Sequence, residues 1–220
     1  AHLLQHLTGD SVELVDGFKK TVFGSEYSSS VFRSAYIRKF SGAVRFHVVA
    51  PSASARGRQV KRFVRRLPRL ISGLKVELVD RPELANFRVY VVRRRNYLRT
   101  IRQKVYRNPN AVVRGRCMVR SVFNRSGIRR SDAVIVADEG ARLFRRCMTE
   151  EILQGLGPLN DDRSLKSSMF NDTTGFTRMT RFDRIILNML YDPRLATGST
   201  LAQVEKLLPR LAKRAQKRVR

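Results

Sequence analysis

The sequence has 220 residues, 42% of them hydrophobic, which is enough to build one domain with its own core. Its 45 Lys and Arg against 18 Asp and Glu give a formal net charge of +27, so the surface should attract polyanions, unless the arginines form only a solvated face. No apolar run has the length of a membrane helix, so no transmembrane segment is predicted. The sequence also has no Gly-rich phosphate loop and no Cys/His finger, which excludes the commonest nucleotide-binding and zinc-finger classes.

Residues 1–34 are predicted to form a helical and loop extension outside the main domain. Apolar spacing favours a helix near residues 10–23, and a serine-rich loop should follow it. His2 and His6 lie four residues apart, which is a metal-like spacing, but histidines near a terminus are usually exposed to solvent. A packing role for the helix is therefore expected, and a metal role for these histidines is not.

Residues 35–200 are predicted to form the main domain, which opens with a strand and a basic helix. The β-branched run at residues 43–50 predicts a strand, and His47 within it is expected to be a packed core residue. Apolar residues recur every three or four positions over residues 57–71, which predicts an amphipathic helix that Pro68 should kink or shorten. The outer face of this helix is the first predicted polyanion-binding surface and carries Arg58, Arg62, Arg65 and Arg66.

Four later segments rich in β-branched and apolar residues predict strands at residues 75–80, 87–92, 117–123 and 133–137. The third of them is expected near a sheet edge, and a helix is predicted before it at residues 96–105. Arginines directly after the second strand extend the predicted polyanion-binding surface: Arg93, Arg94 and Arg95. Together these periodicities predict a mixed α/β domain.

The stretch from Arg145 to Asp162 has the spacing of a metal-binding helix. Zinc peptidases use two ligands one turn apart, a carboxylate beside the first as general base, and a third ligand brought back by a turn. Glu150 and Gln154 lie four residues apart and project from one helix face, with Glu151 beside the first. The predicted ligands are Glu150, Gln154 and either Asn160 or Asp161, and Glu151 is the predicted general base.

These offsets resemble the metzincin signature, in which all three ligands are histidines. All three histidines are replaced here, and a neutral amide such as Gln154 is a poor zinc ligand. Downstream, Ser168-Met169-Phe170 and the segment at residues 179–183 resemble the methionine turn and closing helix of the metzincins. That resemblance implies that Met169 forms the floor below the site.

The run from Cys147 to Leu195, with EEILQGLGPLND, SSMFND and LYDPRL, resembles an uncharacterised family of bacterial exported, zincin-like domains, as do FGSEY and IRKF nearer the start. The resemblance implies a metzincin-like twisted mixed sheet with a motif helix and C-terminal helices. It also implies an edge strand that pairs with an extended peptide, and a periplasmic or secreted location after removal of a leader. In an exported protein Cys117 and Cys147 would form one disulfide, whereas in a reducing compartment they would be two buried thiols.

The last third of the chain predicts a closing helix at residues 181–191 and a basic amphipathic helix and tail at residues 201–220. The loop before them concentrates acidic and amide side chains, which suit a calcium or other hard-cation site but are also ordinary turn formers. They are Asn160, Asp161, Asp162, Asn171 and Asp172.

Three functions fit these features. The favoured one is a non-catalytic binding or assembly protein of the bacterial envelope, with an acidic protein, an envelope polymer or an extended peptide as its partner. The second is a peptidase that uses zinc or another divalent cation, with Glu151 as general base. The third is a basic protein that holds nucleic acid or another polyanion by non-specific electrostatics.

Overall fold

The computed structural model describes residues 9–24 and 35–219. His2, His6 and most of the predicted serine-rich loop lie outside these residues. The predicted N-terminal helix is present as an α-helix, α1 (Gly9–Phe18), that continues into one π-helical segment, η1 (Lys19–Phe23). Within the described residues, no helix is both long and apolar enough to span a membrane.

Five strands form one mixed sheet in the order β2-β1-β3-β5-β4. The first four of these pair in parallel, whereas β4 runs antiparallel to β5. Their bounds are β1 (Val44–Val49), β2 (Val76–Leu78), β3 (Phe87–Val92), β4 (Cys117–Asn124) and β5 (Gly127–Val136). The mixed α/β class and the edge position of the strand that begins at Cys117 are thereby confirmed.

The last strand, β5, begins earlier than the sequence predicts. A tight turn between Asn124 and Gly127 joins it to β4, and Gly127 has a φ of 118°, a backbone conformation that favours glycine. The predicted strand at residues 133–137 covers only the apolar end of β5, although Ser131 and Asp132 just before it are buried as well. The missed half carries the polar residues Arg129 and Arg130, which hide the strand pattern.

Helices cover both faces of the sheet. The long helices α2 (Ala55–Leu70) and α4 (Ala141–Gln154) pack on one face, where Val89 and Ile135 belong to the main core. The alternate strand residues Tyr90 and Val134 point to the opposite face and pack with the short helix α3 (Tyr97–Thr100) and the following η5 (Ile101–Tyr106). Two short 3-10 turns, η3 (Pro82–Leu84) and η4 (Arg94–Asn96), flank β3.

The helix α2 begins at a side-chain cap and runs past its proline. Ser54 accepts a hydrogen bond from the Gly57 N–H, and the helix includes Pro68 and ends two residues later at Leu70. A proline so close to the C-terminal end is tolerated, because it removes only one of the last backbone hydrogen bonds.

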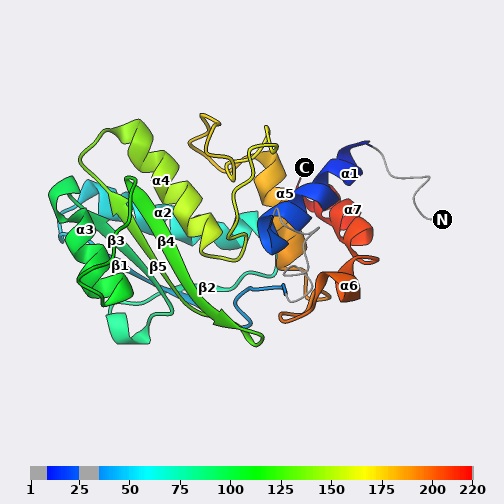
Figure 1. Ribbon diagram of the computed structural model, residues 1–220, viewed down its shortest axis with the longest axis horizontal. Helices are drawn as coiled ribbons and strands as arrows, with labels where there is room; N and C mark the ends of the chain where they lie inside the picture. The colour runs from blue at the N-terminus through cyan, green and yellow to red at the C-terminus, as the bar shows by residue number, and fades with distance from the viewer. Residues whose placement is uncertain (1–8, 25–34, 220) are drawn as a thin grey trace.

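The C-terminal helices form a group with α1 at one end of the molecule, on the right in Figure 1. The closing helix is α5 (Arg181–Leu190), as predicted, whereas the expected single helix over residues 201–220 is divided into α6 (Leu201–Val204) and α7 (Leu208–Arg218). Pro209 lies in the first turn of α7, which is a favourable place for proline to begin a new helix. Leu14 in α1 and Val219 after α7 share one core cluster with the sheet and the long helices.

One disulfide joins the sheet edge to the motif helix. Cys117 at the start of β4 is bonded to Cys147 in α4, with their Cα atoms 5.7 Å apart. The predicted disulfide is confirmed, and it fixes α4 against the edge strand one helical turn before Glu151.

Candidate functional site

The helix α4 presents the predicted site residues on two of its sides. Glu150, Glu151 and Gln154 are each only 7% exposed, so all three carry polar groups into a largely dry environment. Glu151 lies one turn after Cys147, on the side that is bonded to β4. Glu150 and Gln154 instead face the loop between α4 and α5.

Glu150 is held by an arginine from the preceding turn. The Arg146 Nε atom lies 3.2 Å from Glu150 Oε2, and the same guanidinium donates to the backbone oxygens of Thr174 at 2.7 Å and Phe176 at 3.0 Å. Arg146 therefore fixes Glu150 and ties the long loop to α4. Such an arginine contact gives the carboxylate a counter-charge but leaves the remaining lone pairs of its oxygens free.

Gln154 is connected to the other end of the same loop. Its Nε2 donates to Asp161 Oδ1 at 2.7 Å. The neighbouring Asn160 is directed elsewhere, because its Nδ2 donates to the backbone oxygen of Thr21 in η1 at 3.0 Å. Of the two alternatives for a third ligand, only Asp161 thus contacts the α4 side chains.

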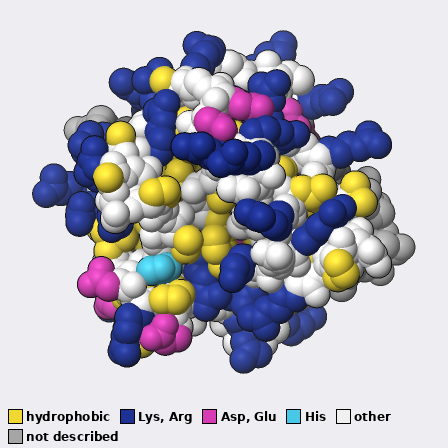
Figure 2. Space-filling view, turned by 90° about the vertical axis from the view of Figure 1, so that its left-hand side faces the viewer, with side chains coloured by type: hydrophobic (Ala, Val, Ile, Leu, Met, Phe, Trp, Pro, Cys, Tyr) yellow, Lys and Arg dark blue, Asp and Glu magenta, His cyan; other side chains and the backbone are white. Residues whose placement is uncertain are grey.

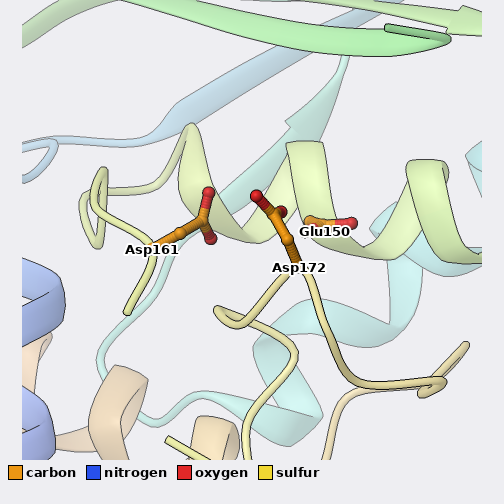
Figure 3. A group of neighbouring side chains, drawn as sticks. All are labelled: Glu150, Asp161 and Asp172. Carbon is orange, nitrogen blue, oxygen red and sulfur yellow. The ribbon is translucent and has the colours of Figure 1, made fainter. Parts of the chain in front are cut away.

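Three carboxylates converge at this loop. Glu150, Asp161 and Asp172 each offer one oxygen, and these oxygens lie within 4.8 Å of one another. Figure 3 shows Asp161 and Asp172 reaching from the loop toward α4, which carries Glu150. Asp172 belongs to the acidic and amide cluster of the sequence but lies beyond the helical offsets, so the ligand spacing alone could not select it.

The environment of the cluster disfavours negative charge. Burial raises the pKa of Glu150 to about 7, with Asp161 and Asp172 adding to the effect and Arg146 opposing it. Burial and the Asp172 charge likewise raise the pKa of Asp161 to about 6. A positively charged ligand would relieve this repulsion and allow the carboxylates to ionise.

Glu151 is the most isolated acid of the site. Burial raises its pKa well above the ordinary value, and the charges of Glu150, Asp161 and Asp172 raise it further. Its side chain has no hydrogen bond or ion pair to any other part of the described chain. Burial and these neighbouring charges therefore favour the protonated, neutral form of Glu151.

The donor atoms suit a hard cation better than zinc. Zinc prefers imidazole and thiolate, and both cysteines are consumed by the disulfide. His47, the one histidine within the described residues, lies on β1 with its Nδ1 3.0 Å from the Val79 oxygen. Three carboxylates and an amide provide only oxygen ligands, which calcium, magnesium and manganese prefer.

Within this loop, Met169 lies in a turn that a buried aspartate organises. Met169 is fully buried, and its N–H donates to both carboxylate oxygens of Asp183 in α5. Ser168 donates its hydroxyl to Asp183, and Thr180 donates through both its N–H and its hydroxyl. The sequence singled out Met169, but Asp183 is the residue that fixes the turn.

The predicted polyanion-binding arginines do not form one surface. Arg93 and Arg95 line a cavity of about 1010 Å³ at the carboxyl ends of β1 and β3, whereas Arg94 donates to the Gly115 oxygen at 2.6 Å. Figure 2 shows Lys and Arg spread over one face of the molecule, around hydrophobic side chains near its centre. On α2, Arg62 and Arg66 line a second cavity, and Arg58 and Arg65 lie outside both.

The sequence matches the model of one protein family over residues 11–210, which is most of the chain. The chain belongs to this family, DUF2927, described as a protein of unknown function. A comparison with curated proteins found no match. The match supports the resemblance to an uncharacterised family, and the DUF2927 region includes the whole carboxylate loop and all five strands.

The raised pKa values predict that the metal-free protein loses stability as the pH rises. A carboxyl whose pKa is raised on folding binds more protons in the folded state than in the unfolded state. Its contribution to the free energy of unfolding is complete below the unfolded pKa, near 4.5, and is lost as the pH rises through the folded pKa, which is about 7 for Glu150. Glu151→Gln removes one such group and should flatten the decline between pH 5 and pH 8 by up to about 1.4 kcal/mol per pH unit.

Urea unfolding in chelator at several pH values measures this slope. The matched control is Glu77→Gln, because Glu77 is exposed on β2. An identical pH slope in wild type and Glu151→Gln would show that Glu151 titrates normally in the folded protein.

Proposed function

We propose that this DUF2927 protein is a zincin-like domain of the bacterial envelope that binds partners without hydrolysing them, and that its α4 site holds a hard divalent cation. One observation carries the proposal. The positions where a zinc peptidase has its two helix histidines are Glu150 and Gln154, and both are already engaged, by Arg146 and Asp161. The oxygens that remain suit a structural or binding cation.

The order of elements supports the zincin-like assignment. The elements follow the order expected of that fold: a strand, a basic helix, two strands, an antiparallel edge strand, the last strand and the motif helix. A turn with a buried methionine comes after the motif helix. The disulfide between β4 and α4 favours an exported protein, because structural disulfides persist in oxidising compartments.

The edge strand β4 provides a surface for the proposed partner. It pairs only with β5 among the described strands, so its outer side has backbone groups available to an extended peptide. Arg116 before β4 is paired with Glu139, and Arg120 within it donates to the Val105 oxygen, so the preference for an acidic protein or envelope polymer rests on the net positive charge of the whole sequence.

The cation site predicts a definite metal content. Protein purified without chelator should contain about one oxygen-preferring ion per chain, calcium, magnesium or manganese, by elemental analysis. Asp161→Asn should weaken calcium binding by tenfold or more in calorimetry, whereas Asp162→Asn should not, because Asp162 accepts from Ser164 instead. Affinity should fall as the pH drops below about 7, the pKa of Glu150, because protons compete with the ion.

Three results would contradict this site: no ion in any preparation, equal binding by the Asp161 and Asp162 variants, or affinity that does not change with pH. Glu151→Gln should keep the ion, since Glu151 faces the edge strand and is not one of the three converging carboxylates.

A second function, metal-dependent peptide hydrolysis, is favoured by one observation. Glu151 is a buried acid with a raised pKa and no partner among the described residues, which is the condition of a general base. Zinc at one ion per chain, together with cleavage of an unfolded protein that Glu151→Gln abolishes, would establish the hydrolase and displace the non-catalytic proposal.

A further inference from the structure

A second cavity, of about 690 Å³, lies beside α4 and is lined by none of the three converging carboxylates. It is bounded by α2, α4, the segment at residues 177–180 and the start of α5. Its volume falls in the range of small-ligand sites. Arg145 and Thr149 from α4 line it, whereas Arg146 and Glu150 belong to the carboxylate site, so the two sites use different sides of one helix.

Six arginines from four different segments line this cavity, which we call the arginine cavity: Arg62, Arg66, Arg145, Arg178, Arg181 and Arg184. No described residue of its lining is acidic. Elsewhere arginines often pair with a carboxylate, as Arg130 does with Asp132 and Arg214 with Asp192. The arginine cavity thus concentrates positive charge, and no described residue of its lining supplies a counter-charge.

Five of the six guanidiniums are available to a ligand. Only Arg184 is committed, through its Nε, to the Leu70 oxygen at 3.1 Å. The others make no side-chain hydrogen bond or ion pair to any described residue. Like charges in one cavity repel each other, so an anion bound there gains from all of them at once.

The cavity is not uniformly polar. Apolar side chains contribute to its lining, namely Phe63, Leu70, Met148, Met179 and Val219. Methionines adapt to ligands of irregular shape, and an apolar surface beside arginines suits a molecule that has both a charged and an apolar or planar part. A small inorganic anion alone would leave this surface without a contact.

We propose that the arginine cavity binds a ligand with two or more phosphate groups attached to an apolar or planar part. Guanidinium groups contact phosphate oxygens in a bidentate manner, and several such groups suit a multivalent phosphate better than a single carboxylate. The ligand is either a soluble diphosphate compound or the phosphorylated headgroup of a lipid. This inference is independent of the cation site.

Isothermal titration calorimetry of the full chain with inorganic tripolyphosphate tests the site. Calorimetry is suitable because the chain has no Trp, so tryptophan fluorescence cannot report binding. Arg62→Gln/Arg66→Gln should weaken binding on the order of a hundredfold, about tenfold for each arginine that no longer donates charge-assisted hydrogen bonds to phosphate. The matched control is Arg65→Gln/Arg69→Gln on the same helix, which removes the same charge outside the cavity.

The control variant should bind tripolyphosphate within about threefold of the wild-type affinity, since it alters only the overall electrostatic field of the protein. Equal weakening in both double variants would overturn the site, because it would mean that net charge alone attracts phosphate. Failure of the wild type to bind tripolyphosphate would also overturn it.

Two further titrations separate the sources of the ligand. A soluble nucleoside diphosphate and vesicles that contain a diphosphorylated lipid are each compared with tripolyphosphate, with Arg145→Gln/Arg178→Gln as an independent pair of cavity variants. Tighter binding of either one than of tripolyphosphate, abolished in these variants, supports the apolar part of the proposal and identifies the source. If both bind more weakly than tripolyphosphate, the requirement for an apolar or planar part is wrong.

Discussion

Asp183→Ala should destabilise the protein by about 3–5 kcal/mol, the largest effect expected of any single substitution in the loop region. Asp183 is completely buried and accepts hydrogen bonds from Ser168, Met169 and Thr180. Its removal leaves two buried donors, the Ser168 hydroxyl and the Met169 N–H, and two half-buried donors of Thr180 without this acceptor, and it opens a cavity between the loop and α5. It also removes the capping box at the start of α5, because the Asp183 carboxylate accepts from the Thr180 N–H.

Chemical denaturation of the variant measures this loss. The control Glu83→Ala removes an exposed carboxylate whose one ion pair among the described residues is with Arg81 at 3.6 Å, and it should change stability by less than about 0.5 kcal/mol. Asp183→Asn should lie between the two, since it keeps the shape but replaces one acceptor by a donor. A loss below about 1 kcal/mol for Asp183→Ala would mean that the turn around Met169 does not depend on this carboxylate.

The Asp183 network also explains how the carboxylate loop keeps its shape. Three of the contacts that fasten the loop are those of Asp183 with Met169, Arg146 with Thr174 and Asn160 with Thr21. Asp161 and Asp172 lie between these points. Their approach to Glu150 is therefore set by the surrounding framework, and a cation would meet carboxylates that are already in position.

The regular elements could be predicted because their apolar periodicity is strong. The strand at residues 87–92 and the start of the helix at Arg181 agree with the structure to the residue. Prediction failed where packing or turn chemistry outweighs periodicity. The polar first half of β5 is a strand because its backbone pairs with β4, and the helix predicted over residues 201–220 is interrupted before Pro209.

The site could be predicted only as far as helix geometry extends. Four-residue spacing correctly places Glu150 and Gln154 on one side of α4, with Glu151 beside them. The partners of these residues come from a loop whose path no periodicity encodes. Asp172 and the arginine cavity depend on that path, as residues 177–180 bring Arg178 against arginines of α2 and α4 that are more than thirty residues away in sequence.

Loss of the disulfide should cost about 3–4 kcal/mol, because Cys117 and Cys147 are 30 residues apart and the bond restricts the unfolded chain. Two measurements separate the bond from the volume of its sulfur atoms. Reduction of the wild type breaks the bond and keeps both side chains, whereas Cys117→Ala/Cys147→Ala also removes buried sulfur, since Cys147 is only 1% exposed. The double variant should therefore be less stable than the reduced wild type, and both should be less stable than the oxidised protein in urea.

The same comparison tests the envelope proposal. The bond fixes α4 to β4 one turn before Glu151, so its reduction should also loosen the packing between the motif helix and the edge strand. Faster hydrogen exchange in α4 and β4 than in α5, after reduction, would report this local effect. A protein that must keep these elements together by a covalent bond works best in an oxidising compartment. Equal stability of the reduced and oxidised forms would remove this argument for export, because the fold would then be equally stable in a reducing compartment.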